Sequence, residues 1–300
     1  MQGKPSLSLA AVVAFLNEEQ LLPRTLASLE RQTRRPDLLL LVDDGSGDRS
    51  ADYAASFAAR HGYAQLLSRP RRSRNADRLA QAAELLAFQW SLEQLPAGQK
   101  FGVLAKLDAD LEFPADFFER IVGALEAEPT LGIAGSQLSV SGGRSAPARE
   151  RSQSWHVRGA TKFYRAECWQ AIEPLPPILG WDTIDETRAR INGFDVRCIE
   201  FPDQEPLHLR PTGSYDGAVR GFLRRGVAAW GYGAHPLHVL VSAFVRMRER
   251  PILLGGFAYL AGYLHAAFRR APRAEPAARH YLQREQLQRL QMTFSRGGAR

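Results

Sequence analysis

The feature that most constrains the fold is an alternation of wholly apolar runs with amphipathic segments over the first half of the chain. The apolar runs are expected as strands, and strands without a polar face must be covered by helices on both sides. The sequence therefore predicts an α/β domain with a mostly parallel sheet flanked by helices. The expected strands are 7–15, 38–42, 101–107 and 133–140, and the expected helices are about 49–60, 77–94 and 115–128.

The start of the chain and its cysteines bear on the compartment. Lys4 precedes the first apolar run as in a signal peptide, but no A-x-A-like cleavage site follows the run. We therefore interpret it as a buried first strand. Cys168 and Cys198 show neither metal-ligand spacing nor a disulfide framework, which favours a reducing compartment.

The net charge of +7 is distributed unevenly along the chain. Residues 207–300 carry 15 arginines against four acids, whereas residues 1–206 carry 24 basic residues against 28 acids. The positive charge therefore belongs to the C-terminal region. Its arginines accompany long aliphatic runs and not aromatic residues in a polar groove, so nucleic-acid binding is a poorer explanation than a membrane surface.

Polar residues follow three of the expected strands. Asn-Glu stands at 17–18, Asp-Asp at 43–44, and Asp108 and Asp110 end the third run with one residue between them. Ligands of parallel sheets bind beyond the carboxyl ends of the strands. Two carboxylates at this spacing can bind Mg²⁺ or Mn²⁺ on a diphosphate. The alternative is that they are solvated acids or helix caps.

Five stretches of the chain carry a resemblance to a known family when they are taken in order. They are VVAFLNEEQLLPRTLASLERQ (12–32), LLLLVDDGSGDRS (38–50), LAKLDADLEF (104–113), RGATKFYRAECW (158–169) and GWDTIDETRARINGFDV (180–196). Together they resemble the inverting family 2 glycosyltransferases of the GT-A fold, of the membrane-associated bacterial polysaccharide or glycolipid type. The resemblance implies a nucleotide-sugar donor, such as a UDP-, GDP- or dTDP-sugar.

The resemblance also implies roles for the donor side. Asp44 would contact the base or ribose, Asp108 would lie near the ribose, and Asp110 would hold Mg²⁺ or Mn²⁺ on the diphosphate. His208 would be a further metal ligand, or else an ordinary structural histidine. The implied donor-binding residues are Phe15, Asn17, Glu18, Asp44, Asp77, Lys106, Asp108 and Asp110.

The motif WDTIDE offers three acids for the general base that an inverting transfer needs. The resemblance favours Asp185, with Asp182 and Glu186 as alternatives. The other interpretation is that Asp182 and Asp185 only cap a helix that runs through 187–191. On the acceptor side, the resemblance implies Arg158, Gly159 and Trp181, although RGATKFYR also reads as an ordinary β–turn element.

The C-terminal region combines apolar helical segments with arginines. Segment 235–250 is amphipathic, 252–268 lacks a formal charge, and 275–291 is a polar helix with a leucine stripe. The segment 252–268 is short for a membrane span, and Gly255, Gly256 and Gly262 weaken that reading. We expect helices in the membrane interface, with a single span or a buried helix as alternatives.

Two further elements have two interpretations each. The Gly-, Ser- and Arg-rich segment 141–154 is expected as a loop, either a lid or a surface connection. Arg224 and Arg225 could clamp a diphosphate, or they could face solvent or lipid.

These features together predict a catalytic domain over 1–230 and a membrane-associating region over 231–300. The expected reaction is inverting transfer to an acceptor hydroxyl, with a lipid-linked glycan or polyprenyl phosphate as acceptor, at the cytoplasmic face of a bacterial-type plasma membrane. Its role would lie in cell-envelope or exopolysaccharide synthesis. The alternatives are a sugar nucleotidyltransferase, which NEEQ does not favour because it is no glycine-rich phosphate loop, and a non-catalytic membrane scaffold.

Overall fold

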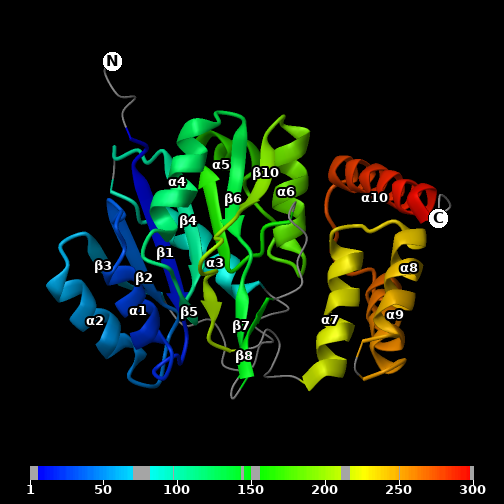
Figure 1. Ribbon diagram of the computed structural model, residues 1–300, viewed down its shortest axis with the longest axis horizontal. Helices are drawn as coiled ribbons and strands as arrows, with labels where there is room; N and C mark the ends of the chain where they lie inside the picture. Colours follow the sequence, from blue (N-terminus) through cyan, green and yellow to red (C-terminus); the bar gives the residue numbers. More distant parts are fainter. Residues whose placement is uncertain are drawn as a thin grey trace. The chain divides into compact units, whose positions relative to one another are not determined.

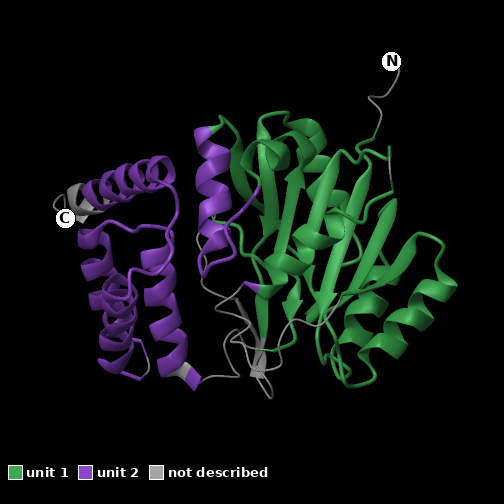
Figure 2. Cartoon of the chain, turned by 180° about the vertical axis from the view of Figure 1, so that it is seen from behind, with its two compact units in different colours: residues 1–76, 83–173, 192–212 green, residues 77–82, 174–191, 213–300 purple. Residues whose placement is uncertain are grey.

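The computed structural model describes residues 6–69, 82–96, 98–142, 145–149, 156–210, 217–249 and 251–297. These residues form two compact units (Figures 1 and 2). The first unit contains the described residues of 1–76, 83–173 and 192–212, and the second contains those of 77–82, 174–191 and 213–300.

A seven-stranded sheet forms the centre of the first unit. Its strands are β1 (Leu9–Phe15), β2 (Leu38–Asp43), β3 (Ala64–Ser68), β4 (Val103–Asp108), β6 (Leu131–Ser136), β9 (Thr161–Arg165) and β10 (Asp195–Ile199). They lie in the order β10-β6-β9-β4-β1-β2-β3. Only β9 runs antiparallel to its neighbours, β4 and β6. The predicted mostly parallel α/β sheet is confirmed.

Helices cover both faces of this sheet. They are α1 (Leu22–Glu30), α2 (Ser50–Arg60), α3 (Ala83–Leu92), α4 (Phe117–Ala127) and α5 (Ala166–Ile172). Adjacent residues of a strand point to opposite faces, and β9 shows both. Phe163 packs against Phe117 of α4, and Tyr164 packs against Phe88 of α3 and Trp169 of α5. Helices α1 and α2 share the apolar core with α4, so α3 and α5 form the second layer.

A second, four-stranded sheet corrects two expectations. Its strands are β5 (Leu111–Glu112), β7 (Ser139–Gly142), β8 (Ser145–Arg149) and β11 (Leu207–His208), in the order β5-β11-β7-β8. The single strand expected at 133–140 is therefore two strands, β6 and β7, which belong to different sheets. The loop expected over 141–154 contains β8, which pairs with β7 through the backbone and needs no apolar run to do so.

The second unit is helical among its described residues (Figure 2). Its helices are α6 (Trp181–Ile191), α7 (Gly217–Gly231), α8 (Pro236–Arg246), α9 (Leu254–Phe268) and α10 (Pro276–Gly297). Helices α8, α9 and α10 correspond to the three segments expected at the C-terminal end. None of the described helices combines the length and the apolar character that a membrane span requires. The functional boundary at residue 230 stays a prediction.

Glycines let α7 and α9 approach each other closely. A Cβ atom on Gly226 would lie 2.0 Å from the carbonyl oxygen of Tyr259, and one on Gly262 would lie 2.0 Å from that of Leu223. Likewise, a Cβ atom on Gly256 of α9 would lie 2.5 Å from the carbonyl oxygen of Ala243 in α8. The glycines that weakened the reading of 252–268 as a membrane span are therefore contact points between helices.

We expect Gly262→Ala to lower the free energy of unfolding by about 2–3 kcal/mol, because its new methyl group meets backbone that no rotamer change can move. Gly221→Ala on α7 is the matched control, since nothing lies within 4 Å of its Cβ position. The control should be neutral or stabilise by up to about 1 kcal/mol through helix propensity. Urea unfolding followed by helical circular dichroism measures both, and equal effects would contradict the close packing.

Candidate active site

The loops that follow β1 and β2 are tied together. Asn17 adopts a left-handed backbone conformation, with φ 54°, which asparagine tolerates better than most residues. Its backbone N–H donates to Ser46 Oγ at 3.1 Å, and its side-chain Oδ1 accepts from the N–H of Gly47 at 2.8 Å. The N–H of Glu18 donates to Ser50 Oγ at 2.7 Å. These bonds fix the position of Glu18 next to the end of β2.

Asp44 is held by a buried ion pair. Its Oδ1 lies 3.1 Å from Arg69 Nη1, and both side chains are only 6% exposed. Arg69 directly follows β3, and its backbone N–H donates to the carbonyl oxygen of Asp43 at 2.8 Å. The sequence analysis did not identify Arg69, because the pair joins residues that are 25 positions apart and follow different strands. A role for Asp44 at the base or ribose stays a prediction.

Arg69→Met is expected to lower the free energy of unfolding by about 3–5 kcal/mol, because it removes the charge that the buried Asp44 carboxylate contacts in this ion pair. Arg197→Met is the matched control. Arg197 pairs with Glu128 at 2.7 Å, but the two side chains are 44% and 46% exposed, so its loss should cost less than about 1 kcal/mol. Urea unfolding of both variants tests this difference, and similar losses would show that the buried pair contributes little.

Lys106 pairs with Asp108, one of the two acids at the end of β4. The side chain of Lys106 is 3% exposed. Its Nζ lies 2.5 Å from Asp108 Oδ1 and donates to the carbonyl oxygen of Gly159 at 2.8 Å. The lysine thereby joins Asp108 to the turn before β9. Asp108 remains 34% exposed and can still meet a ligand.

Asp110 contacts an imidazole and a guanidinium. His208 Nε2 lies 3.3 Å from Asp110 Oδ2, and Arg210 reaches the same oxygen with Nη2 at 2.9 Å and Nε at 3.1 Å. The antiparallel pairing of β5 with β11 brings these residues together, since His208 lies opposite Leu111. The structure thus unites the two residues that the sequence analysis named as metal ligands.

The environment of Asp110 favours its ionised form. Burial raises the pKa of its carboxyl, but hydrogen bonds and charge from His208 and Arg210 outweigh burial and hold the pKa below its ordinary value. For Glu18 the balance is opposite, because burial raises its pKa despite its contact with Arg210. Asp110 is therefore an anion at neutral pH.

Arg210 is the main residue of this cluster that the sequence analysis missed. Its guanidinium bridges Asp110 and Glu18, whose carboxylates follow β4 and β1. The two acids at the end of β4 thus have partners within the chain, because Lys106 contacts Asp108, and His208 and Arg210 contact Asp110. Arg210 lies two residues beyond His208, the last residue of β11, so the motif HLR at 208–210 was the available signal.

Asp110 and His208 also form a donor set that fits a divalent cation. The described residues contain no group of three His, Cys, Asp or Glu side chains suited to a metal. A carboxylate and an imidazole can still bind Mn²⁺ or Mg²⁺ where a diphosphate and water complete the coordination, as is common for Mg²⁺. Arg210 Nη2 would then remain beside the diphosphate, where a guanidinium is complementary to phosphate oxygens.

The three acids of WDTIDE lie on α6 in the second unit. This helix begins at Trp181, so Asp182 lies in its first turn and Asp185 and Glu186 in its second. The helix does run through 187–191, but it begins earlier, so the alternative that Asp185 caps its start is wrong, whereas Asp182 does lie in the first turn. Asp185 and Glu186 are fully buried, and Asp185 Oδ1 accepts from the N–H of Glu186 at 2.6 Å. Asp182 is half-buried.

The remaining predicted residues are dispersed. Phe15 is buried in the core of the first unit, and its carbonyl oxygen accepts from the N–H of Asp44 at 3.0 Å. Arg158 is half-buried in the turn before β9. Arg225 on α7 pairs loosely with Glu249 at 3.9 Å. Asp77 lies outside the described residues.

Comparison with solved structures defines the class of protein. The chain is similar to the mannosyltransferase PcManGT from Pyrobaculum calidifontis in complex with GDP-Man and Mn²⁺, with 17% identity and a TM-score of 0.53 over 91% of this chain and 78% of that one. GalNAc-T7 with UDP, GalNAc and Mn²⁺ gives 13% identity and a TM-score of 0.57 over 90% and 55%. At such identities the likeness establishes the fold, which is GT-A.

The family follows from the sequence. The model of glycosyl transferase family 2 matches residues 10–174, more than half of the chain. The chain belongs to this family. It is also 36% identical over 123 residues to the undecaprenyl-phosphate 4-deoxy-4-formamido-L-arabinose transferase of Pectobacterium carotovorum subsp. carotovorum (strain PC1). That match covers 38% of this chain and 32% of the relative, so the chain corresponds to about a third of the relative's length.

Proposed function

We propose that this protein transfers a sugar, with inversion, from a nucleoside diphosphate sugar to an acceptor hydroxyl. The observation that carries the proposal is the cluster of Asp108, Asp110, His208 and Arg210 beyond the carboxyl ends of β1 and β4. This is the edge of a parallel sheet at which ligands bind. The cluster combines acids for a metal and ribose with a guanidinium for phosphate.

The proposed roles follow the chemistry of each side chain. Asp44 and Asp108 accept hydrogen bonds from the nucleoside, and Asp110 with His208 holds Mn²⁺ or Mg²⁺. A bound divalent cation would offset the negative charge that develops on the leaving diphosphate. Arg210 contributes a fixed positive charge beside the oxygens of the leaving diphosphate. The similar structures of PcManGT with GDP-Man and Mn²⁺ and of GalNAc-T7 with UDP, GalNAc and Mn²⁺ support a donor of this kind.

Asp185 is the proposed general base. Its carboxylate would take the proton of the acceptor hydroxyl as that oxygen attacks the anomeric carbon, and the bond from this carbon to the diphosphate oxygen would break. The assignment rests on the resemblance of WDTIDE to the family motif and on the chemistry of the carboxylate. Asp182 is the alternative, because its side chain is more accessible than that of Asp185.

Product analysis tests the reaction type. Incubation with a UDP-, GDP- or dTDP-sugar and Mn²⁺ should release the nucleoside diphosphate, because the transferase breaks the bond between the sugar and the diphosphate. A sugar nucleotidyltransferase would instead release pyrophosphate. Release of pyrophosphate, or of no product while a lipid-linked acceptor and donor are present, would contradict the proposed reaction.

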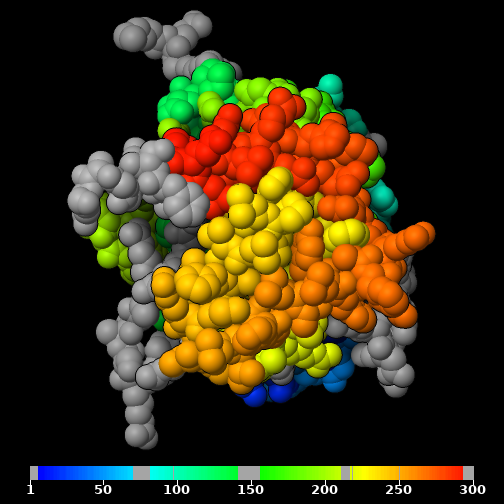
Figure 3. All heavy atoms as spheres, turned by 90° about the vertical axis from the view of Figure 1, so that its right-hand side faces the viewer, coloured from blue at the N-terminus to red at the C-terminus, as the bar shows by residue number. Residues whose placement is uncertain are grey.

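The proposed acceptor is a lipid-linked glycan or a polyprenyl phosphate at the cytoplasmic face of the plasma membrane, in cell-envelope or exopolysaccharide synthesis. In the described part of the chain, all large hydrophobic side chains that are exposed belong to the second unit. Most of them lie on α8, on α9 and in the turn between these helices, which share the face shown in Figure 3. Phe244, Phe257 and Phe268 are 59%, 59% and 89% exposed.

The charge of this surface fits an anionic membrane. Arg246 is the last residue of α8 and Arg248 follows it, and Arg269 and Arg270 follow α9. Helices with exposed apolar residues and flanking arginines lie in the headgroup region of a bilayer, where each cation near anionic lipid contributes about 1 kcal/mol. The relative that acts on undecaprenyl phosphate, as its name states, supports a lipid acceptor.

We expect the protein to sediment with vesicles that contain phosphatidylglycerol, and Phe244→Ser with Phe257→Ser to weaken binding about tenfold or more through lost apolar burial. Ile191→Ser on α6 is the matched control, since Ile191 is 41% exposed outside this surface. Equal binding by the double variant and the control would contradict membrane docking through α8 and α9.

A further inference from the structure

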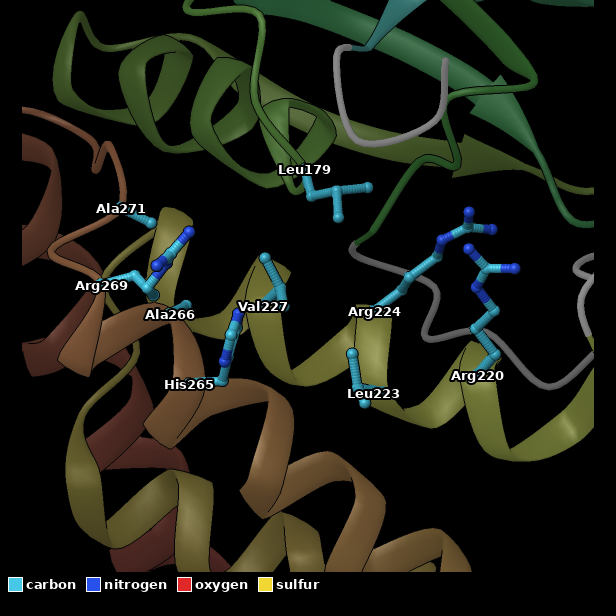
Figure 4. A pocket seen from close by; sticks show the side chains of 9 residues that line it. All are labelled: Leu179, Arg220, Leu223, Arg224, Val227, His265, Ala266, Arg269 and Ala271. Carbon is cyan, nitrogen blue, oxygen red and sulfur yellow. The ribbon is translucent and has the colours of Figure 1, made fainter. Parts of the chain in front are cut away.

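A cavity of about 350 Å³ opens between α7 and the end of α9 in the second unit (Figure 4). One face of α7 supplies Arg220, Leu223, Arg224 and Val227, which share that face because they are spaced at i, i+3, i+4 and i+7. The lining also contains residues of α9 and of the loops before α6 and after α9. These are Leu179, His265, Ala266, Arg269 and Ala271.

Close packing of the two helices gives this cavity its fixed walls. Gly262 lies one turn before Ala266 on α9, and its backbone contacts the carbonyl oxygen of Leu223. Gly226 makes the reciprocal contact with Tyr259. At each contact a glycine of one helix packs against the backbone of the other, so close packing fixes the distance between the two helix faces that line the cavity.

The lining is cationic and apolar together. Three of the nine lining residues are arginines, one is a histidine, and none is acidic. The guanidinium fork matches the geometry of a phosphate, and it binds phosphate through charge-assisted hydrogen bonds. The other five lining residues are apolar. An anion that is polar throughout would gain nothing from them, whereas a phosphate with an aliphatic chain would use both parts.

Apolar side chains adjoin the cationic ones outside the cavity as well. Leu264 and Phe268 directly precede His265 and Arg269 in α9, and they are 63% and 89% exposed. Leu223 is itself 37% exposed and lines the cavity. A chain attached to a bound phosphate would therefore find apolar surface along α9.

We propose that this cavity binds the phosphate group of a lipid phosphate, a phosphate ester with a long aliphatic chain. The inference rests on the proposed function, in which such a lipid is the acceptor or carries it. Arg220 and Arg224 have partners within the protein as well, so Arg269 gives the most direct test. Arg269 directly follows α9 and lines the cavity.

Isothermal titration calorimetry on the full chain, without donor, tests the cavity separately from the reaction. The probes are farnesyl phosphate, farnesol and inorganic phosphate, and vesicles of phosphatidylcholine with and without phosphatidylglycerol serve as the second source of lipid phosphate. Farnesyl phosphate should bind at least tenfold more tightly than either farnesol or inorganic phosphate. Arg269→Gln should weaken its binding about tenfold or more, as expected for loss of one charge-assisted hydrogen bond.

Matched variants complete the test. Arg225→Gln removes the same charge from α7, but Arg225 does not line the cavity, so this variant should bind farnesyl phosphate as the parent does. Leu223→Ala should weaken the binding of farnesyl phosphate more than the binding of inorganic phosphate. Equal losses in Arg225→Gln and Arg269→Gln, equal affinity for phosphate and farnesyl phosphate, or binding to anionic vesicles alone would each overturn the proposal. Donor binding, measured on the same proteins, shows whether the proposed function survives such a result.

Discussion

Replacing Asp110 by asparagine is expected to reduce the rate of sugar transfer about a thousandfold or more. The substitution keeps the size of the side chain but removes the anion that would hold the divalent cation, which contributes several kcal/mol to transition-state stabilisation. It also leaves His208 and Arg210 without the carboxylate that both contact. Initial rates at saturating donor and several Mn²⁺ concentrations measure the effect.

Asp116→Asn is the matched control for this experiment. Asp116 pairs with Arg120 on the surface and is 38% exposed, so the same chemical change is made outside the cluster. Its transfer rate should equal that of the parent. A rate for Asp110→Asn within about threefold of the parent would contradict the metal-binding role, since it means a loss of transition-state stabilisation below about 1 kcal/mol, which is too small for a lost metal ligand.

Asp185→Asn is expected to lower the transfer rate about a hundredfold to ten-thousandfold while donor binding persists. A general base contributes a factor of this size, and an amide cannot take the acceptor proton. The variant should remain folded, because asparagine Oδ1 can still accept the N–H of Glu186 as Asp185 Oδ1 does. Single-turnover rates and donor affinity, determined side by side, separate loss of chemistry from loss of binding.

Two parallel variants decide between the acids of WDTIDE. Asp182→Asn and Glu186→Gln should transfer within about tenfold of the parent, as variants that keep the base should. Full activity of Asp185→Asn together with an inactive Asp182→Asn would assign the base to Asp182 instead. The pair of Glu186 with Arg190 at 3.7 Å gives Glu186 a structural role in either case.

The parallel sheet and its ligand-binding edge could be predicted from the sequence because both depend on local patterns. Strands that are apolar on both faces require helical layers, and acids at their ends mark the edge where ligands bind. The runs at 38–42 and 101–107 accordingly became β2 and β4, with Asp44, Asp108 and Asp110 just beyond or at their ends.

The rest of the cluster depends on pairing over long sequence separations. Arg210 meets Glu18 across 192 positions, and it lies just beyond β11, a strand of only two residues, too short for a detectable hydrophobic period. Arg69 likewise lies beyond β3, where no motif links it to Asp44. The helix contacts of the glycines in α9 could not be predicted either, because a sequence shows that a side chain is absent but not which helix then approaches.

The central claim is that Asp110 and its neighbours form a metal-dependent site for a nucleoside diphosphate sugar. The most direct measurement is thermal unfolding of the purified protein with UDP-, GDP- and dTDP-sugars, with and without Mn²⁺. One donor should raise the unfolding temperature only when Mn²⁺ is present, and Asp110→Asn should lose that rise while Asp116→Asn keeps it. Stabilisation by no donor, in buffer and in detergent, or a rise that is the same in both variants, would contradict the account.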